Sequence, residues 1–109
     1  MEYFPDRWLM VRLTSDKGIH HRIFASWSGG YLTADSWKLN SGVTNITETE
    51  DSYSFEGSSG SIYHCRKNSY GSTGYGAGVL DNLITRSLEH GVVIEPIPEE
   101  TDFTSIVYV

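Results

Sequence analysis

The stretch that looks most like a chemical site is residues 61–78, where His64 and Cys65 precede a glycine-rich run between residues 71 and 78. A cysteine beside a histidine can act as a nucleophile with its base, and glycines before a helix can cradle a phosphate. A phosphatase-type loop, however, needs an arginine where Gly71 stands, and a Walker loop needs a lysine where Ala77 stands. The dinucleotide fingerprint also lacks its third glycine. The stretch is therefore predicted to be a strand and the turn into a helix, with anion binding at that turn as the alternative.

His64 and Cys65 are consecutive residues of a predicted strand, residues 61–66. Consecutive side chains of a strand point to opposite faces, so these two cannot form a nucleophile and its base. A lone cysteine belongs to the residue types most often buried, and Cys65 is predicted to pack in the core. A reactive thiol would instead require Arg66 or Lys67 to lower its pKa, or a histidine approaching in space.

The histidines do not have the spacing of a metal site. His20, His21 and His64 could supply ligand atoms together with Cys65, but no pair shows the i, i+2 or i, i+4 spacing of common sites. We predict no metal and no cofactor. His21 is expected to be a hydrogen-bonded histidine of the core, and His90 to lie beside the negative end of a helix dipole.

An aromatic and polar cluster in "WSGGYLTADSW" is the better candidate for a binding site. Flat apolar rings with a few polar groups are typical of small-molecule pockets and of interfaces. The competing interpretation is a set of core aromatics around a bulge at Gly29 and Gly30. With two tyrosines near the helix entry, the candidate binding residues are Trp27, Tyr31, Asp35, Trp37, Asn40, Tyr70 and Tyr75.

The elements that must position these residues are mostly strands. Alternation of side chains and turn residues between the segments predict about six strands, followed by a helix from Gly76 or Ala77 to His90. The apolar positions of the helix recur at spacings of three and four, and Gly91 fits a left-handed cap. The predicted strands are residues 7–14, 19–27, 31–33 with 36–39, 43–49, 53–56 and 61–66, then 92–94 and 103–109 after the helix.

These elements predict an α+β fold in a single domain, residues 1–109. The expected architecture is a mainly antiparallel sheet, built as a meander of about six strands and one or two C-terminal strands, with one amphipathic helix packed on one face. The other face would then be bare. Because the chain has 3 Trp and 7 Tyr, we expect aromatic rings on that face or in the seam of a homodimer.

The composition excludes several classes of partner. The chain has 8 basic and 14 acidic residues, giving a net charge of −6, and its basic residues are scattered, which argues against nucleic-acid binding. The single cysteine and an N-terminus without the pattern of a signal peptide predict a cytoplasmic protein. No apolar run approaches the roughly 20 residues that cross a bilayer, so no membrane partner is expected.

The leading hypothesis is a small non-enzymatic binding module, which takes a protein partner or a small ligand on an aromatic sheet face. The residues do not match the motifs of a known family. One alternative is a small hydrolase or transferase with a pocket near the helix entry, using Cys65 or a histidine with Tyr70 or Tyr75. A second alternative is an acidic inhibitor or immunity-type protein that offers carboxylates to a basic partner.

Overall fold

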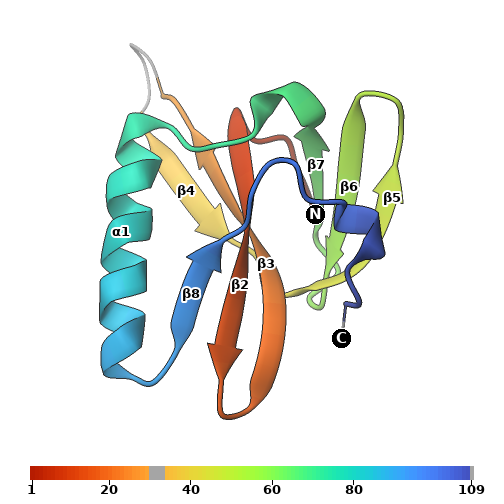
Figure 1. Ribbon diagram of the computed structural model, residues 1–109. Helices are drawn as coiled ribbons and strands as arrows, with labels where there is room; N and C mark the ends of the chain where they lie inside the picture. Colours follow the sequence, from red (N-terminus) through yellow and green to blue (C-terminus); the bar gives the residue numbers. More distant parts are fainter. Residues whose placement is uncertain (30–33, 109) are drawn as a thin grey trace.

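A computed structural model describes residues 1–29 and 34–108, and it confirms an α+β fold with one α-helix and eight strands in two mainly antiparallel sheets (Figure 1). The strands are β1 (Glu2–Tyr3), β2 (Arg7–Ser15), β3 (Gly18–Trp27), β4 (Ser36–Leu39), β5 (Val43–Glu48), β6 (Ser52–Gly57), β7 (Ile62–Arg66) and β8 (Val93–Pro96). The helix is α1 (Gly74–Glu89), and two 3-10 turns are η1 (Lys67–Ser69) and η2 (Phe103–Ser105). The predicted strand segment 31–33 lies outside the described residues.

The first sheet has the strand order β4-β3-β2-β8 and is built on the long β2–β3 hairpin. Gly18 closes this hairpin with a φ of +117°, as the turn residues predict. Along β2 both sets of alternating side chains are apolar: Leu9 and Val11 face α1, whereas Trp8 and Met10 face away from it. A strand that is apolar on both faces needs a cover on each side.

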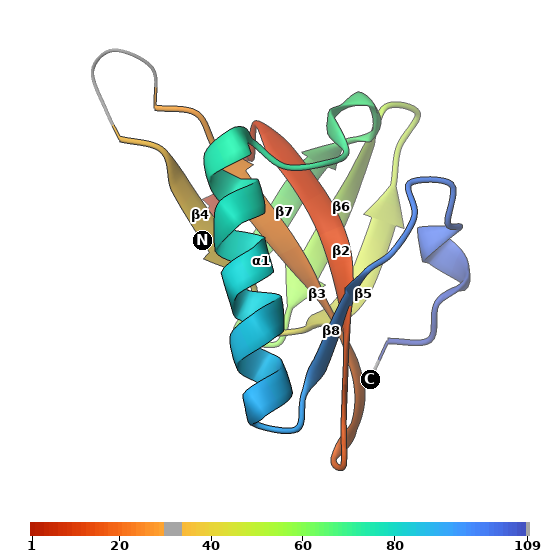
Figure 2. The same ribbon diagram turned by 60° about the vertical axis from the view of Figure 1, so that its left-hand side comes forward.

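The second sheet, with the order β1-β7-β6-β5, supplies the cover on the side away from α1. Figure 2 shows the three layers, with β5, β6 and β7 behind the β2–β3 hairpin and α1 in front of it. The prediction of a bare sheet face is therefore wrong, because the second half of the meander folds over the first half after β4. The side chains between the sheets include Trp8, Met10, Ile23, Ala25, Val43, Phe55, Tyr63, Cys65 and Phe103. A homodimer stays a prediction, but a bare aromatic face no longer supports it.

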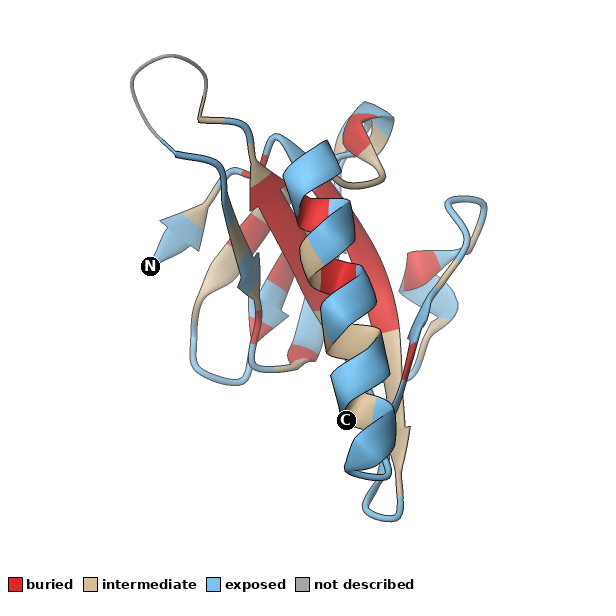
Figure 3. Ribbon diagram, turned by 90° about the vertical axis from the view of Figure 1, so that its left-hand side faces the viewer, coloured by how far each residue is buried: buried red, intermediate tan, exposed pale blue. Residues whose placement is uncertain are grey.

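The helix packs on the outer face of the first sheet, as predicted. Its apolar stripe, centred on Leu80 and Leu83, lies against Phe24 of β3 and Ile94 of β8. In Figure 3 the strands behind the helix are buried, while the side of the helix toward the viewer is largely exposed. The helix ends before Gly91, whose φ of +75° matches the predicted left-handed cap.

Two segments differ from the prediction. The predicted strand 103–109 is wrong in its described part, because Asp102 accepts hydrogen bonds from the Thr104 amide at 3.1 Å and the Ser105 hydroxyl at 2.6 Å and so caps the 3-10 turn η2. The two-residue strand β1 was not predicted, and it pairs in parallel with β7. Both segments matter, since η2 buries Phe103 between the sheets and β1 borders the candidate site described below.

Candidate functional site

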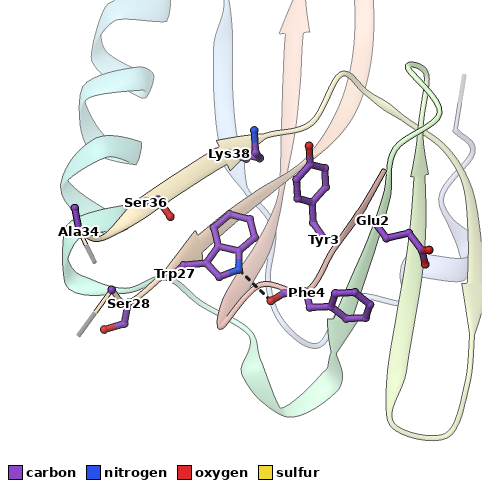
Figure 4. Close-up of a pocket in the computed structure, with 9 residues that line it drawn as sticks. Glu2, Tyr3, Phe4, Trp27, Ser28, Ala34, Ser36 and Lys38 are labelled. Carbon is purple, nitrogen blue, oxygen red and sulfur yellow. Dashed lines mark hydrogen bonds between the residues drawn. The ribbon is translucent and has the colours of Figure 1, made fainter. Parts of the chain in front are cut away.

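A hollow of about 600 Å³ opens at the side of the molecule, between β1 at the edge of one sheet and β4 at the edge of the other. We call it the edge hollow. Its walls come from residues 2–4, 27–29 and 34–38, and the packing of the two sheets brings the first of these segments against the other two, which are distant from it in the sequence. The residues lining it are Glu2, Tyr3, Phe4, Trp27, Ser28, Gly29, Ala34, Ser36 and Lys38 (Figure 4).

Trp27, the last residue of β3, is the largest side chain of the edge hollow. Its indole Nε1 donates a hydrogen bond to the carbonyl oxygen of Phe4 at 3.0 Å, and its ring lies edge-on to the Tyr3 ring with the centroids 6.4 Å apart. Figure 4 shows the indole between β4 and Tyr3, with this hydrogen bond as a dashed line. Because the indole N–H is already bonded, Trp27 offers its half-buried ring rather than a polar group.

Two carboxylates fix the chain where it leaves β3. Asp6 accepts a hydrogen bond from the amide of Ser28, and Asp35 accepts one from the amide of Gly29, each at 2.8 Å. Bonds from a carboxylate to backbone amides are among the stronger ones in proteins. The two aspartates therefore hold the Ser28–Gly29 corner of the edge hollow in place, and the structure gives Asp35 this positioning contact.

The charges of the edge hollow are arranged unevenly. The Lys38 ammonium lies 5.2 Å from the centroid of the Tyr3 ring, a cation–π contact, and makes no ion pair with the described residues. Glu2, by contrast, is already bonded to His64, with 2.6 Å between Oε1 and Nε2. A ligand entering the edge hollow thus meets aromatic rings, the Lys38 ammonium, which has no ion-pair partner among the described residues, and the Glu2 carboxylate, which is bonded to His64.

The predicted cluster of binding residues is divided between the faces of the first sheet. Trp37 pairs with Ser26 and stacks on Phe24 under α1, with ring centroids 5.7 Å apart, so it lies on the other face from Trp27. Asn40 is buried, and its Oδ1 accepts from the amides of Ile23 at 2.9 Å and Gly42 at 3.3 Å. Tyr31 lies outside the described residues.

The two tyrosines of the helix entry do not join this site either. Tyr70 packs edge-on against Trp8, accepts a hydrogen bond from the Met10 amide at 3.1 Å and donates one to the Ile97 carbonyl at 2.5 Å. Burial raises the pKa of Tyr70 to about 12, which makes it a poor acid or base at neutral pH. Tyr75 is exposed on the first turn of α1. The glycine-rich entry itself forms the start of the helix, where Thr73 Oγ1 accepts from the Gly76 amide at 3.0 Å.

Three residues that sequence reasoning missed complete the edge hollow. Tyr3, Phe4 and Lys38 all line it, and Phe4 is 68% exposed, which is unusual for a phenylalanine. Their only signal in the sequence is the adjacent aromatic pair Tyr3 and Phe4 near the N-terminus, which carries no periodicity. In the sequence, Lys38 has the pattern of an ordinary solvent-exposed residue of a short strand. Its position follows from the pairing of β3 with β4.

Cys65 and His64 point to opposite faces of the second sheet, as predicted. Cys65 is fully buried between the sheets, whereas His64 is partly exposed on the outer face. Burial raises the pKa of the Cys65 thiol far above its usual range, so the thiolate needed for reaction is scarcely formed. The thiol belongs to the core and is not a nucleophile.

We therefore expect native protein to resist modification of Cys65 by a thiol reagent such as Ellman's, with a rate at least about a hundredfold below that of the unfolded chain. Substitution Cys65→Ser should lower the free energy of unfolding by about 1–3 kcal/mol, because it places a hydroxyl in an apolar site. Rapid, complete labelling of the folded protein would contradict this assignment.

Neither a cofactor nor a known family guides the interpretation further. Within residues 1–29 and 34–108 there is no group of three His, Cys, Asp or Glu side chains arranged to hold a metal ion. In the same part of the chain, α1 is too short and too polar to cross a membrane. Comparison with family models, with curated proteins and with solved structures found no match.

Proposed function

We propose that this chain is a binding module that takes a small ligand into the edge hollow, and that the ligand combines a flat apolar ring with an anionic group. The observation that carries the proposal is the presence of the Trp27 and Tyr3 rings beside an ammonium group, Lys38, without a carboxylate partner among the described residues. This proposal keeps the hypothesis of a binding module, but it places the binding site at the edges of the two sheets and not on a sheet face.

The dimensions support a small molecule as the ligand. Pockets for such ligands usually measure about 300–1,000 Å³, have mostly apolar walls and carry a few polar groups that set orientation. The edge hollow, at about 600 Å³, lies within this range, although it is a shallow hollow that is largely open to solvent. Trp27 is held by its bond to the Phe4 carbonyl and by contact with Tyr3, so little conformational entropy is lost when a ring stacks on it.

The charge of Lys38 selects among such ligands. The protein as a whole carries a net charge of −6, which repels anions at long range. Within about 10 Å, however, the local ammonium dominates over charges that salt has screened. An aromatic carboxylate should therefore bind better than the neutral alcohol of the same ring, and the difference should shrink as salt is added.

The experiment is a fluorescence titration with 2-naphthoate, checked by calorimetry. We expect quenching of tryptophan emission in the wild type, binding at least about tenfold weaker in Trp27→Ala, and about tenfold weaker in Lys38→Gln. Each tenfold loss corresponds to about 1.4 kcal/mol. Salt should weaken binding to the wild type but scarcely affect Lys38→Gln.

The matched control is Trp37→Phe. Trp37 lies on the face of the first sheet that α1 covers, opposite to the face of Trp27. The variant should bind 2-naphthoate with wild-type affinity. If Trp37→Phe weakens binding as much as Trp27→Ala does, or if naphthalene-methanol binds as well as the carboxylate, the assignment of ligand and site is wrong.

A further inference from the structure

The outer face of the second sheet has a hollow of its own, about 530 Å³ in volume, which shares Phe4 with the edge hollow. We call it the outer hollow. Ser54 of β6 and His64 of β7 line it, and they are directly opposed across the two strands. Arg66 lines the same hollow and is opposed to Ser52, about 7 Å further along the sheet. The binding function proposed above does not use these side chains.

A continuous chain of hydrogen bonds joins a hydroxyl, an imidazole and a carboxylate at this place. Ser54 Oγ lies 3.0 Å from His64 Nδ1, and His64 Nε2 lies 2.6 Å from Glu2 Oε1. The Phe4 ring stacks nearly parallel on the imidazole, with centroids 4.7 Å apart and an interplanar angle of 14°. Ser54 of β6 and Glu2 of β1 thus hold the two nitrogens of the imidazole, and Phe4, just after β1, covers one of its faces.

The carboxylate decides which nitrogen of the neutral ring carries the proton. An ionised Glu2 can only accept a hydrogen bond, so His64 must present Nε2–H to it. In the neutral imidazole Nδ1 then has a free lone pair, and it can only accept. The Ser54 hydroxyl is therefore the donor to Nδ1, the orientation that a base needs to remove its proton.

We propose that Ser54 is a nucleophile for acyl transfer from esters, with His64 as its general base and Glu2 as the positioning residue that fixes the ring. As Ser54 Oγ bonds to the ester carbonyl carbon, its proton moves to His64 Nδ1. Collapse of the adduct breaks the bond to the alcohol oxygen, which leaves with that proton. Water then attacks the acyl-serine with the same help from His64, and the carboxylic acid and free Ser54 are released.

Arg66 is the positively charged side chain that lines the outer hollow. The carbonyl oxygen becomes negative in the tetrahedral adduct, and a fixed positive group beside it lowers the barrier. Arg66 is exposed and lies on the same strand face as His64, two residues along β7. The arrangement differs from the common serine triad in two respects. The serine contacts Nδ1 and the carboxylate contacts Nε2, so the two nitrogens exchange places, and a guanidinium stands where the triad has the backbone amides of an oxyanion hole.

The test uses the purified wild-type chain and a fluorophosphonate, a reagent that attaches covalently to activated serines. We expect one adduct by mass spectrometry, located at Ser54 by peptide mapping, together with slow release of 4-nitrophenol from 4-nitrophenyl acetate. Ser54→Ala should abolish the adduct. His64→Gln should slow its formation at least about a hundredfold, since general-base catalysis typically contributes that much.

Two further measurements separate activation from a merely structural role. In the labelled wild type, peptide mapping should find no adduct at Ser52, because this neighbouring serine of the same strand face is opposed to Arg66 and not to the imidazole. Glu2→Gln should slow labelling, and Glu2→Asp should restore part of the rate, because it returns a carboxylate to the ring. Absence of an adduct at Ser54 in the folded wild type, or equal labelling of Ser52 and Ser54, would overturn the proposal.

Discussion

Substitution Trp8→Ala should cost this fold about 3–5 kcal/mol of its free energy of unfolding, the range measured for large aromatic side chains removed from cores. Trp8 is 1% exposed and lies between the two sheets. Its ring contacts aromatic rings contributed by other parts of the chain, with centroid distances between 4.7 and 6.0 Å; these belong to Tyr53, Phe55, Tyr70 and Phe103. One side chain thus joins β2, β6, the segment before α1 and η2.

The polar end of the same side chain adds to the loss. Trp8 Nε1 donates a hydrogen bond to the carbonyl oxygen of Arg66 at 2.6 Å, at the end of β7. Alanine would leave that carbonyl without its donor in addition to opening a cavity. Since small domains are stable by only about 5–15 kcal/mol, the variant should have a much lower melting temperature and a large unfolded population under mild denaturant.

Equilibrium unfolding in urea, followed by circular dichroism, measures this effect. The matched control is Trp37→Ala, which removes the same side chain from the layer under α1, where Trp37 is only partly buried and stacks on Phe24 alone among the described rings. Its cost should be smaller by at least about 1 kcal/mol, because less surface returns to water. Equal losses in the two variants would mean that the aromatic cluster between the sheets does not dominate stability.

The local elements of the fold follow closely from the sequence, whereas the stacking of the sheets does not. Alternation in β2 and β3 and the spacing in α1 are local patterns, and the predicted bounds agree with the structure to within one to two residues at most ends. The layer arrangement depends on contacts between distant segments. One feature of the sequence did indicate two layers on the first sheet. In β2, Trp8 and Met10 are as apolar as Leu9 and Val11, and a strand that is apolar on both sides must be covered on both faces.

The candidate site illustrates why function was harder to predict than fold. Trp27 and Trp37 stand near each other in the sequence, but Trp27 pairs with Ser36 and Trp37 with Ser26. Residues paired across strands share a face, so the two tryptophans fall on opposite faces, and a shift of one residue in register would reverse this. Register depends on the connection between β3 and β4, and composition does not specify it.

The hydrogen-bond chain of the outer hollow was also beyond the reach of sequence reasoning. The pairing of Ser54 with His64 requires the register of the β6–β7 hairpin. The contact with Glu2 requires β1, a strand of two residues that no periodicity can signal. The sequence did predict that His64 points away from Cys65, and this is the condition that places the imidazole on the outer face.

Substitution Gly76→Ala should destabilise the protein by about 1–3 kcal/mol, although alanine is the better helix former. A Cβ at Gly76 would lie 2.9 Å from the Cβ of Ser26, closer than such atoms approach in proteins, and 3.2 Å from both Ser26 Oγ and Thr73 Oγ1. Ser26 is fully buried on β3, and its Oγ accepts a hydrogen bond from the Thr73 amide at 3.1 Å. Relief of the contact would move the first turn of α1 off the sheet and stretch that bond.

Gly78 provides the control on the same helix, two residues later. A Cβ there would meet nothing within 4 Å, so Gly78→Ala should stabilise the protein by up to about 1 kcal/mol through helix propensity alone. The two substitutions are chemically identical, so their opposite signs isolate the close approach of α1 to β3. Chemical denaturation of both variants measures the difference.

A double-mutant cycle identifies the atom responsible. Removing the Ser26 side chain by Ser26→Gly costs stability on its own, because it takes away the acceptor for the Thr73 amide. In that background Gly76→Ala loses its closest contact and keeps the approach to Thr73 Oγ1 at 3.2 Å, so the energies of the two substitutions should be coupled by at least about 0.5 kcal/mol. If they were additive, the cost of Gly76→Ala would come from a contact other than Ser26, and the Thr73 hydroxyl at 3.2 Å is the next nearest group.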